Sequence, residues 1–406
     1  MEKQKNMPQL RFPEFSEEWR IIKLGDVSVV KTGDKDTQNK VEDGNYPFYV
    51  RSDKIERINS YSFDGEAILT SGDGVGVGKN FHYINGKFDF HQRVYSIRDF
   101  NNEISGKYVY YYFAERFYKR VIRVSAKNSV DSVRMDMITD MPIPFPSLPE
   151  QLKIASFFTA IDQKINQLKR KVNLLEHYKK GVMQKIFSQE IRFKEDDGQV
   201  FPEWEKKKFV EIYSFKNTNS FSRENLNYEN GTVKNIHYGD IHTKFDTLLD
   251  ITKEDIPYVN EDLPVYKISA QNYCKEGDLV FADASEDLAD VGKSIELVNL
   301  NNETVLSGLH TILARPDLSK IAIGFGGYLM KSNDIRKQIM KEAQGSKVSS
   351  ISATKLSCIQ LNIPVPEEQS KIANFLSAID DKINQTQIQI AKAEVWKKGL
   401  MQQMFV

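Results

Sequence analysis

Apolar residues recur at alternating steps of four and three in two stretches of the chain, residues 154–186 and 372–404. A period of 3.5 residues sustained over about five heptads is the pattern of a coiled-coil helix. Ser147 and Glu150 form a capping box ahead of the first stretch, so we expect long helices over residues 147–189 and 365–406. The seams of the two helices consist of Ile154, Phe158, Ile161, Ile165, Leu168, Val172 and Leu175, and of Ile372, Leu376, Ile379, Ile383 and Ile390.

The two helices belong to an internal repeat. Residues 150–187 align with residues 368–405 without a gap at a shift of 218, and about 20 of the 38 positions are identical. A shorter match lies upstream, where the sequence Val-Gly-Lys occurs at residues 77–79 and again at residues 291–293. Two unrelated amphipathic helices, each packed on its own domain, are disfavoured because the seams match residue for residue. The chain therefore consists of two copies of one unit, a mixed domain followed by a long helix.

Short β-rich runs bounded by Gly, Asp and Asn fill the segments ahead of the helices. We expect strands over residues 46–50, 67–70, 94–97, 278–282, 294–298 and 311–314, and a helix in each segment over residues 107–121 and 326–343. The predicted fold class is α/β (α+β), with two similar globular domains, residues 1–146 and 190–364. Two long antiparallel coiled-coil helices, related by a pseudo-two-fold internal repeat, would hold the domains apart, since 38 helical residues span about 57 Å.

One motif opens both helices. Pro149, Glu150 and Gln151 precede residues 153–165, and residues 366–369 precede residues 371–383. In each copy Glu-Gln is followed by Lys-Ile-Ala, Phe, Ala-Ile-Asp and Lys-Ile. This doubled motif resembles the conserved regions of the specificity (S) subunits of type I restriction–modification systems. The resemblance covers nearly the whole chain, including its two-unit layout.

The resemblance implies a DNA-binding protein that is not an enzyme. Residues 1–146 and 190–364 would be target recognition domains, each of which reads one half of a bipartite target in double-stranded DNA. The helices would set the gap between the halves and dock two modification (M) subunits, and restriction (R) subunits would complete a nuclease. Those partners would use S-adenosylmethionine, ATP and Mg²⁺, so no cofactor is expected on this chain.

Charge favours a different interpretation, because 56 basic and 56 acidic residues leave a formal net charge of zero. A DNA-binding surface would have to be a local basic patch. The alternative is a non-catalytic coiled-coil scaffold protein of a DNA-processing complex. Only two cysteines occur and no apolar run reaches about 18 residues, so we expect a cytoplasmic protein without disulfides or a membrane span.

Candidate DNA contacts in the first domain lie in three short stretches and on one helix. The Gly-rich stretch 71–80 departs from the Walker pattern at Asp73, so a turn near DNA phosphates is expected rather than a nucleotide site. Gln and Arg can read base edges, which singles out residues 91–93, with an ordinary strand face as the alternative. The basic helix suits phosphates and solvent equally. These candidates are Lys79, Asn80, His91, Gln92, Arg93, Arg116, Lys119, Arg120, Arg123, Lys127, Asn128, Ser129 and Arg134.

The second domain offers a matching set of candidates. Residues 344–352 form a polar stretch that aligns with residues 125–134 at the shift of the repeat. His310 fits either a DNA contact or a hydrogen-bonded core histidine, and the core role is favoured. The candidates are Lys293, Ser294, His310, Ser346, Lys347, Ser349 and Ser350.

No metal or catalytic site is expected. His237 and His242 lack neighbouring cysteines, and the acidic residues within 283–290 do not have the spacing of an EF-hand loop. Neither a Walker A motif nor the Asn-Pro-Pro-aromatic tetrapeptide of amino-methyltransferases occurs. A self-sufficient enzyme is therefore disfavoured, and catalysis is expected in partner subunits.

Overall fold

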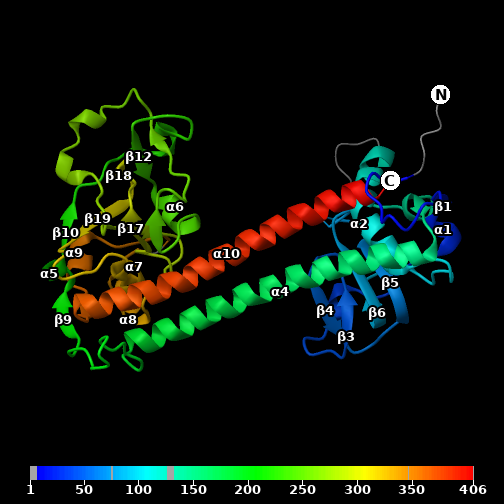
Figure 1. Ribbon diagram of the computed structural model, residues 1–406, viewed down its shortest axis with the longest axis horizontal. Helices are drawn as coiled ribbons and strands as arrows, with labels where there is room; N and C mark the ends of the chain where they lie inside the picture. The colour runs from blue at the N-terminus through cyan, green and yellow to red at the C-terminus, as the bar shows by residue number, and fades with distance from the viewer. Residues whose placement is uncertain (1–6, 75, 126–131, 346, 406) are drawn as a thin grey trace. The chain divides into compact units, whose positions relative to one another are not determined.

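The computed structural model describes residues 7–74, 76–125, 132–345 and 347–405. Two compact units make up the chain: Met1–Arg170 with Gln387–Val406 form unit 1, and Lys171–Thr386 form unit 2. The helices α4 (Leu148–Phe187) and α10 (Pro366–Met404) each contribute one part to either unit (Figure 1). They are the two long helices that the heptad pattern predicts.

Unit 1 is built on a six-stranded sheet. Only β3 and β6 pair in parallel, and the other neighbours are antiparallel. A separate antiparallel pair, β1 (Arg20–Lys23) with β8 (Pro142–Phe145), closes the domain. The strand order of the large sheet is β2 (Val29–Thr32), β7 (Val94–Arg98), β5 (Phe63–Ser71), β6 (Phe81–Phe90), β3 (Tyr46–Tyr49) and β4 (Ile55–Ile58).

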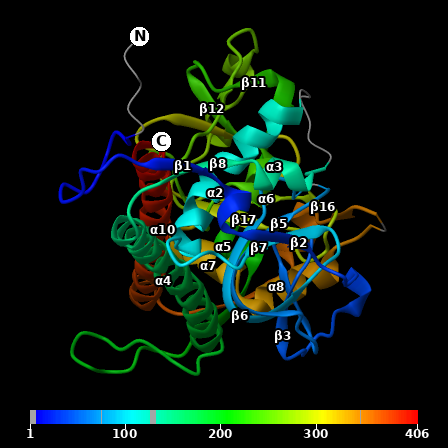
Figure 2. The same ribbon diagram turned by 90° about the vertical axis from the view of Figure 1, so that its right-hand side faces the viewer.

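Helix α2 (Gly106–Ser125) covers this sheet. It contacts β5, β6 and α3 (Met135–Thr139), which Figure 2 labels. The short α1 (Leu24–Val27) contacts α3 as well. One face of α2 is aromatic, and the rings of Phe113 and Phe117 stack with centroids 4.2 Å apart. This face is buried because apolar side chains recur every three or four residues along it.

The core of unit 1 also contains parts of both long helices. Ile154, Phe158, Ile161 and Ile165 of α4 pack in one cluster with Met401 and Met404 of α10. Asp162 of α4 forms an ion pair with Lys397, and Lys169, two turns later, forms one with Glu394. From the first ion pair to the second, the residue number increases along α4 and decreases along α10. The two helices therefore run antiparallel in this unit.

Unit 2 contains two larger sheets. A five-stranded sheet has the order β10 (Tyr213–Lys216), β19 (Thr311–Pro316), β15 (Leu279–Ala282), β17 (Ser294–Asn299) and β13 (Leu248–Asp250). A four-stranded sheet has the order β11 (Leu226–Asn227), β14 (Tyr258–Val259), β12 (Val233–Ile236) and β18 (Thr304–Ser307). Two-stranded pairs join β9 (Glu205–Lys208) to β21 (Gln360–Ile363) and β16 (Ala284–Ser285) to β20 (Ser349–Ser350).

The helices of unit 2 correct one prediction. The single helix expected over residues 326–343 is two helices, α7 (Phe325–Met330) and α8 (Asn333–Glu342). Ser332 precedes α8 with extended backbone angles, φ −63° and ψ 146°, which interrupts the helix. The remaining short helices are α5 (Phe209–Ile212), α6 (Tyr238–Thr243) and α9 (Ala353–Ser357).

The two units share one topology. The order β2-β7-β5-β6 in unit 1 matches β10-β19-β15-β17 in unit 2, and the pair β1-β8 matches β9-β21. The internal repeat seen in the helix motif therefore extends through the six-stranded sheet of unit 1 and the five-stranded sheet of unit 2. The four-stranded sheet of unit 2 is an addition that the sequence pattern did not predict.

Candidate nucleic-acid interface

Three loops of unit 1 meet beside the ends of β5 and β7. The backbone N–H of Gly72 donates to the carbonyl oxygen of Arg93 at 2.7 Å, and the N–H of Val133 donates to the carbonyl of Gly72 at 2.7 Å. Asp73 and Ser132 form an isolated antiparallel bridge. We call the described residues 72–74, 76–80, 91–93 and 132–134 the unit 1 loop junction.

Unit 2 repeats this arrangement bond for bond. The N–H of Asp283 donates to the carbonyl oxygen of His310 at 3.0 Å, and the N–H of Ile351 donates to the carbonyl of Asp283 at 2.8 Å. Ala284 pairs with Ser350, as Asp73 does with Ser132. The described residues among 283–293, 308–310 and 344–350 form the unit 2 loop junction. Most of the candidate DNA contacts named from sequence fall on these two junctions.

Arg93 and His310 stand at the same place in the two junctions. Their side chains are exposed, with relative accessibilities of 65% and 53%. Arg93 Nε lies 3.8 Å from Asp73 Oδ2, and His310 Nδ1 lies 3.3 Å from Asp283 Oδ1. Burial raises the pKa of the Asp283 carboxyl. The favoured core role of His310 is wrong, because its left-handed backbone (φ 55°) turns the side chain outward at the tip of a loop.

His91 and Gln92 have different environments although they are neighbours. The His91 ring is buried, and its Nδ1 accepts a hydrogen bond from the Arg93 N–H at 2.9 Å. Burial lowers the pKa of His91, which favours the neutral ring that this bond requires. Gln92 is exposed and donates to Asp36 Oδ2 at 3.3 Å. His91 therefore supports the turn, while Gln92 and Arg93 present polar groups to solvent.

A glycine precedes each lysine of the repeated Val-Gly-Lys motif for a steric reason. Gly78 and Gly292 have φ values of 64° and 62°. A Cβ at Gly78 would lie 2.6 Å from the Tyr118 ring, and one at Gly292 would lie 2.8 Å from Ile339. The lysines that follow, Lys79 and Lys293, thus take equivalent positions on their junctions.

The residues beside these lysines are more constrained. Lys79 is exposed over the Tyr118 ring, with Nζ 6.0 Å from the centroid, and Asn80 donates to the Arg51 carbonyl at 3.0 Å. Lys293 Nζ donates to the His242 carbonyl at 2.7 Å, and Ser294 is buried in β17.

The basic residues of α2 have mixed surroundings. Arg116 donates to the Phe405 carbonyl at 2.7 Å, and Arg120 donates to the carbonyls of Met137 and Asp140 at 3.0 and 2.9 Å. Lys119 pairs with Glu115 on the same helix, and Arg123 is exposed. Arg116 and Arg120 therefore hold the domain together, and a phosphate-facing role for all four residues remains a prediction.

The polar stretches are described only in part. Lys127, Asn128, Ser129 and Ser346 lie outside the described residues. Arg134 is exposed beside Asp136, with Nε 3.3 Å from the carboxylate, and Lys347 is exposed as well. Ser349 and Ser350 form β20 at the edge of the unit 2 loop junction.

Residues that the sequence did not single out border the unit 2 loop junction. The rings of Tyr238 and His310 meet edge to face with centroids 5.4 Å apart. Arg223 donates to both carboxylate oxygens of Asp240 at 2.8 and 2.9 Å, and its Nη2 lies 3.2 Å from His237 Nδ1. Burial lowers the pKa of His237. These residues lie in the segment that unit 2 has in addition to the shared topology, so no matching sequence in unit 1 could have pointed to them.

The helix seams are buried within the units. Ile154, Phe158, Ile161, Ile165, Leu168, Ile372, Leu376, Ile379 and Ile383 are buried, and Val172, Leu175 and Ile390 are half-buried against the cores. Asp162 accepts from Lys397 and from Tyr111 in unit 1, and Asp380 accepts from Lys179 and Tyr328 in unit 2. The Asp and Lys of the two triads match at the shift of 218, while the two tyrosines are 217 positions apart. Lys179 stands at a seam position of the first helix, where its ion pair with Asp380 places it.

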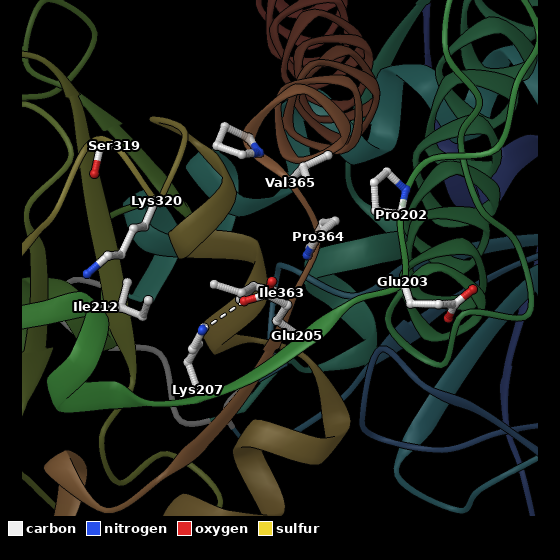
Figure 3. A pocket seen from close by; sticks show the side chains of 11 residues that line it. Pro202, Glu203, Glu205, Lys207, Ile212, Ser319, Lys320, Ile363, Pro364 and Val365 are labelled. Atoms are coloured by element: carbon white, nitrogen blue, oxygen red, sulfur yellow. Dashed lines mark ion pairs between the residues drawn. The ribbon is translucent and has the colours of Figure 1, made fainter.

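A pocket of about 260 Å³ in unit 2 lies away from the loops (Figure 3). Its lining comes from β9, the end of β21 and the start of α10, and Pro202, Lys320 and Pro364 from the connecting segments complete it. Figure 3 shows the ion pair between Lys207 and Glu205, whose atoms are 2.8 Å apart. Because Lys320 is also paired, with Asp317 at 3.1 Å, the pocket offers no free cation to an anionic ligand.

Within the described part of the chain, no cluster of three or more His, Cys, Asp or Glu side chains is arranged to hold a metal ion. Nor is any described helix both long and apolar enough to span a membrane.

A family profile described as "Type I restriction modification DNA specificity domain" matches residues 16–177 and 202–393. The chain is 25% identical over 421 residues to the MjaVIII specificity subunit of Methanocaldococcus jannaschii, which covers 98% of this chain and 93% of that subunit. The EcoDI specificity subunit of Escherichia coli is 25% identical over 187 residues, which are 46% of this chain and 40% of that subunit.

Solved structures show the same fold. The S subunit of a type I restriction–modification system from M. genitalium superimposes with a TM-score of 0.61 at 15% identity, over 98% of this chain and 99% of that chain. A chain from a structure of complex assembly in the type I R-M system gives a TM-score of 0.54 at 16% identity, over 94% and 96% of the two chains. The predicted two-domain fold with long helices is therefore confirmed.

Proposed function

Because this chain belongs to the family of type I restriction–modification DNA specificity subunits, we propose that its two loop junctions are the surfaces that read the halves of a bipartite DNA target. The observation that carries the proposal is the shared backbone frame with different side chains. The same two backbone hydrogen bonds join the three loops of each junction, and the position that Arg93 occupies in unit 1 is occupied by His310 in unit 2. Identical frames with different donors are what two different half-sites require.

The chemistry of the junctions suits base edges and phosphates. Gln92 and Arg93 carry the donors that pair with adenine and guanine, and Lys79 and Lys347 add exposed positive charge. The unit 1 loop junction is a local basic patch, with Lys79, Arg93 and Arg134 against Asp73, so a chain with a net charge of zero can still present a basic surface to DNA. The unit 2 loop junction is more acidic, with Asp283, Glu286, Asp287 and Asp290 against Lys293 and Lys347, and acidic side chains can accept hydrogen bonds from cytosine amino groups. The scaffold alternative is not favoured, because both units match the DNA specificity domain.

The helices supply equivalent surfaces for partners. Tyr178 on α4 and Trp396 on α10 are 218 positions apart, and they are exposed by 54% and 55%. Large exposed aromatic side chains are common anchors of protein interfaces. One such anchor in each unit favours two copies of one partner, the M subunit. S-adenosylmethionine, ATP and Mg²⁺ would be bound by M and R subunits, and the complex would work in the cytoplasm.

The test is to co-express the chain with its cognate M subunit in a host free of adenine methylation and to map methyladenine by long-read sequencing. The expected result is one split motif with two short specified halves and a fixed gap. Replacing residues 20–146 with the corresponding domain of another S subunit should change only one half. A complex that assembles and binds S-adenosylmethionine but leaves all adenines unmodified would contradict the proposal.

Mass photometry tests the partner count separately. The wild-type complex is expected to contain two M subunits, and Trp396→Ala should reduce the count to one at nanomolar concentration. Tyr178→Ala should do the same, because it removes the other anchor. Lys398→Ala, on the same helix, serves as the control.

A further inference from the structure

A small cationic pocket lies at the edge of the unit 2 loop junction and shares Asp290 and Lys293 with it. Its volume is about 250 Å³, and it is lined by residues 289–290 and 293–294, by Met330 and Lys331 at the end of α7, and by Arg336 of α8. Three basic side chains, Lys293, Lys331 and Arg336, and one carboxylate, Asp290, belong to the lining. We call these three basic residues the cationic triad.

The triad is held in place by uncharged oxygens. Lys331 Nζ donates to Thr247 Oγ1 at 2.7 Å, and Lys293 Nζ donates to the His242 carbonyl at 2.7 Å. The Arg336 guanidinium donates to the carbonyls of Ala289, Val291 and Gly292 at 2.8, 2.6 and 3.0 Å. Arg336 thereby fixes the loop that borders the pocket.

None of the three cations has a carboxylate within ion-pair distance among the described residues. Asp290 acts on Arg336, and Asp380 and Asp246 act on Lys331, only at longer range. Burial, together with the charges of Lys179 and Lys293, lowers the pKa of Lys331 to about 8. The three side chains are half-buried. Cations removed even partly from solvent are normally paired, so this group of charges lacks an adjacent counter-ion.

We propose, on the premise that the loop junctions read DNA as argued above, that this pocket binds one phosphate group of the DNA backbone and so fixes the position of unit 2 on the duplex. Lysine and arginine donors are the usual phosphate ligands. The pocket is smaller than the roughly 300 Å³ at which small-molecule sites begin, and no aromatic side chain lines it to stack on a base. These features fit a phosphate group better than a whole nucleotide.

The test compares Lys331→Met and Lys293→Met with Lys337→Met in the complex with M subunits. Lys337 is exposed on α8, the helix that carries Arg336. DNA binding is measured against KCl concentration with target and non-target duplexes. Lys331→Met is expected to weaken binding to both duplexes by the same factor and to lower the slope of log K against log salt by about 0.9, the value for one phosphate.

The methylated motif should remain unchanged in both triad variants, since a phosphate contact carries no sequence information. Lys331→Met should also raise the melting temperature, because it removes a half-buried charge that has no ion-pair partner among the described residues. Lys293→Met tests the same loss of affinity if Lys331→Met fails to fold. A salt slope equal to that of Lys337→Met, or a changed motif, would overturn the phosphate assignment.

Free phosphate is tested in a separate arm. Inorganic phosphate and ATP are titrated into the wild-type complex at constant ionic strength while the melting temperature is followed. Stabilisation that requires Lys331, without any change in DNA affinity for Lys331→Met, would show a site for free phosphate and overturn the DNA assignment. If the wild-type complex methylates no split motif, the proposed function fails; if it does and the salt slope is unaffected, only the pocket proposal fails.

Discussion

Arg93 and His310 occupy the same position in the two units, because the carbonyl oxygen of each accepts a hydrogen bond from the first residue of the neighbouring loop. The distances are 2.7 Å from Gly72 and 3.0 Å from Asp283. The backbone around this position is shared, while the side chain differs in charge, length and hydrogen-bonding pattern. Two domains of one fold can thus recognise two different half-sites, because the side chains differ while the loop backbone stays the same.

The first prediction concerns specificity. Arg93→Ala should relax the choice of base at one position of one half-site, with a loss of discrimination of about 1–3 kcal/mol, because a side chain that pairs with a base edge is removed. His310→Ala should affect only the other half-site. The measurement is the methylation frequency of all single-base variants of the motif.

Lys87→Ala is the matched control for Arg93→Ala. Lys87 is exposed on β6 and pairs in register with Asp64 at the other end of the hairpin. Its removal should leave the motif unchanged. If Arg93→Ala and Lys87→Ala gave the same motif with equal selectivity, Arg93 would not read a base.

The long helices and the repeat could be predicted because their signals are local. The spacing of Ile154, Phe158 and Ile161 reports one helix face, and the shift of 218 relates two such faces. The loop candidates were found through residue types that read DNA. The residue pattern could not show which of these side chains are buried. His91 is buried and supports its turn, whereas His310 is exposed. The difference arises because the backbone conformation at a loop tip depends on partners that are distant in the sequence.

The cationic pocket was beyond the reach of the sequence for a similar reason. Lys331 lies in a segment that the hydrophobic pattern assigns to one continuous helix, but the chain breaks at Ser332. The pocket brings Lys331 together with Lys293, which is 38 positions away and on another element. Such a juxtaposition depends on tertiary packing rather than on spacing along the chain.

The second prediction concerns the buried glutamates that open α4 and α10. Arg11 donates to both oxygens of Glu150 at 2.7 Å, and Arg192 donates to Glu368 at 3.2 and 2.7 Å. Both carboxylates are fully buried. Arg11→Ala and Arg192→Ala should each cost about 3–5 kcal/mol in the free energy of unfolding, because each leaves a buried charge unpaired.

Trp19 and Trp204 provide an internal comparison for these two glutamates. Trp204 Nε1 donates to Glu368 at 3.1 Å, whereas Trp19 Nε1 has no acceptor among the described residues. Both lose similar volume on substitution by phenylalanine. Urea unfolding should therefore show that Trp204→Phe costs about 1–2 kcal/mol more than Trp19→Phe. Equal costs would mean that the Trp204 bond adds no stability.

The third prediction concerns the triads at the helix contacts. Asp380 accepts from Lys179 and, at 2.7 Å, from the Tyr328 hydroxyl. A double-mutant cycle of Lys179→Met with Asp380→Asn should give a coupling free energy of about 1 kcal/mol that decreases in high salt, because the pair is partly exposed. The equivalent cycle at Asp162 and Lys397 should agree within error. A coupling near zero in both cycles would make the ion pairs incidental to stability.

The last prediction concerns pH. Glu296 on β17 is buried and accepts hydrogen bonds from the N–H groups of Gly324 and Gly327 at 2.6 and 2.7 Å. Burial raises its pKa from 4.5 to about 7 in spite of these bonds. Because the folded-state pKa lies above the unfolded one, the folded state binds the extra proton, and stability is lost as the pH rises through about 4.5 to 7.

The loss should amount to at most about 3 kcal/mol, at 1.36 kcal/mol per unit of pKa. Glu296→Gln keeps the shape of the side chain and removes the titration, so its melting temperature should fall less than that of the wild type between pH 5 and pH 7.5. Other carboxylates titrate equally in both proteins, so the difference between the two curves isolates Glu296. Parallel curves would show that Glu296 has the same pKa in the folded and unfolded chain, and that the two glycine N–H groups offset its burial.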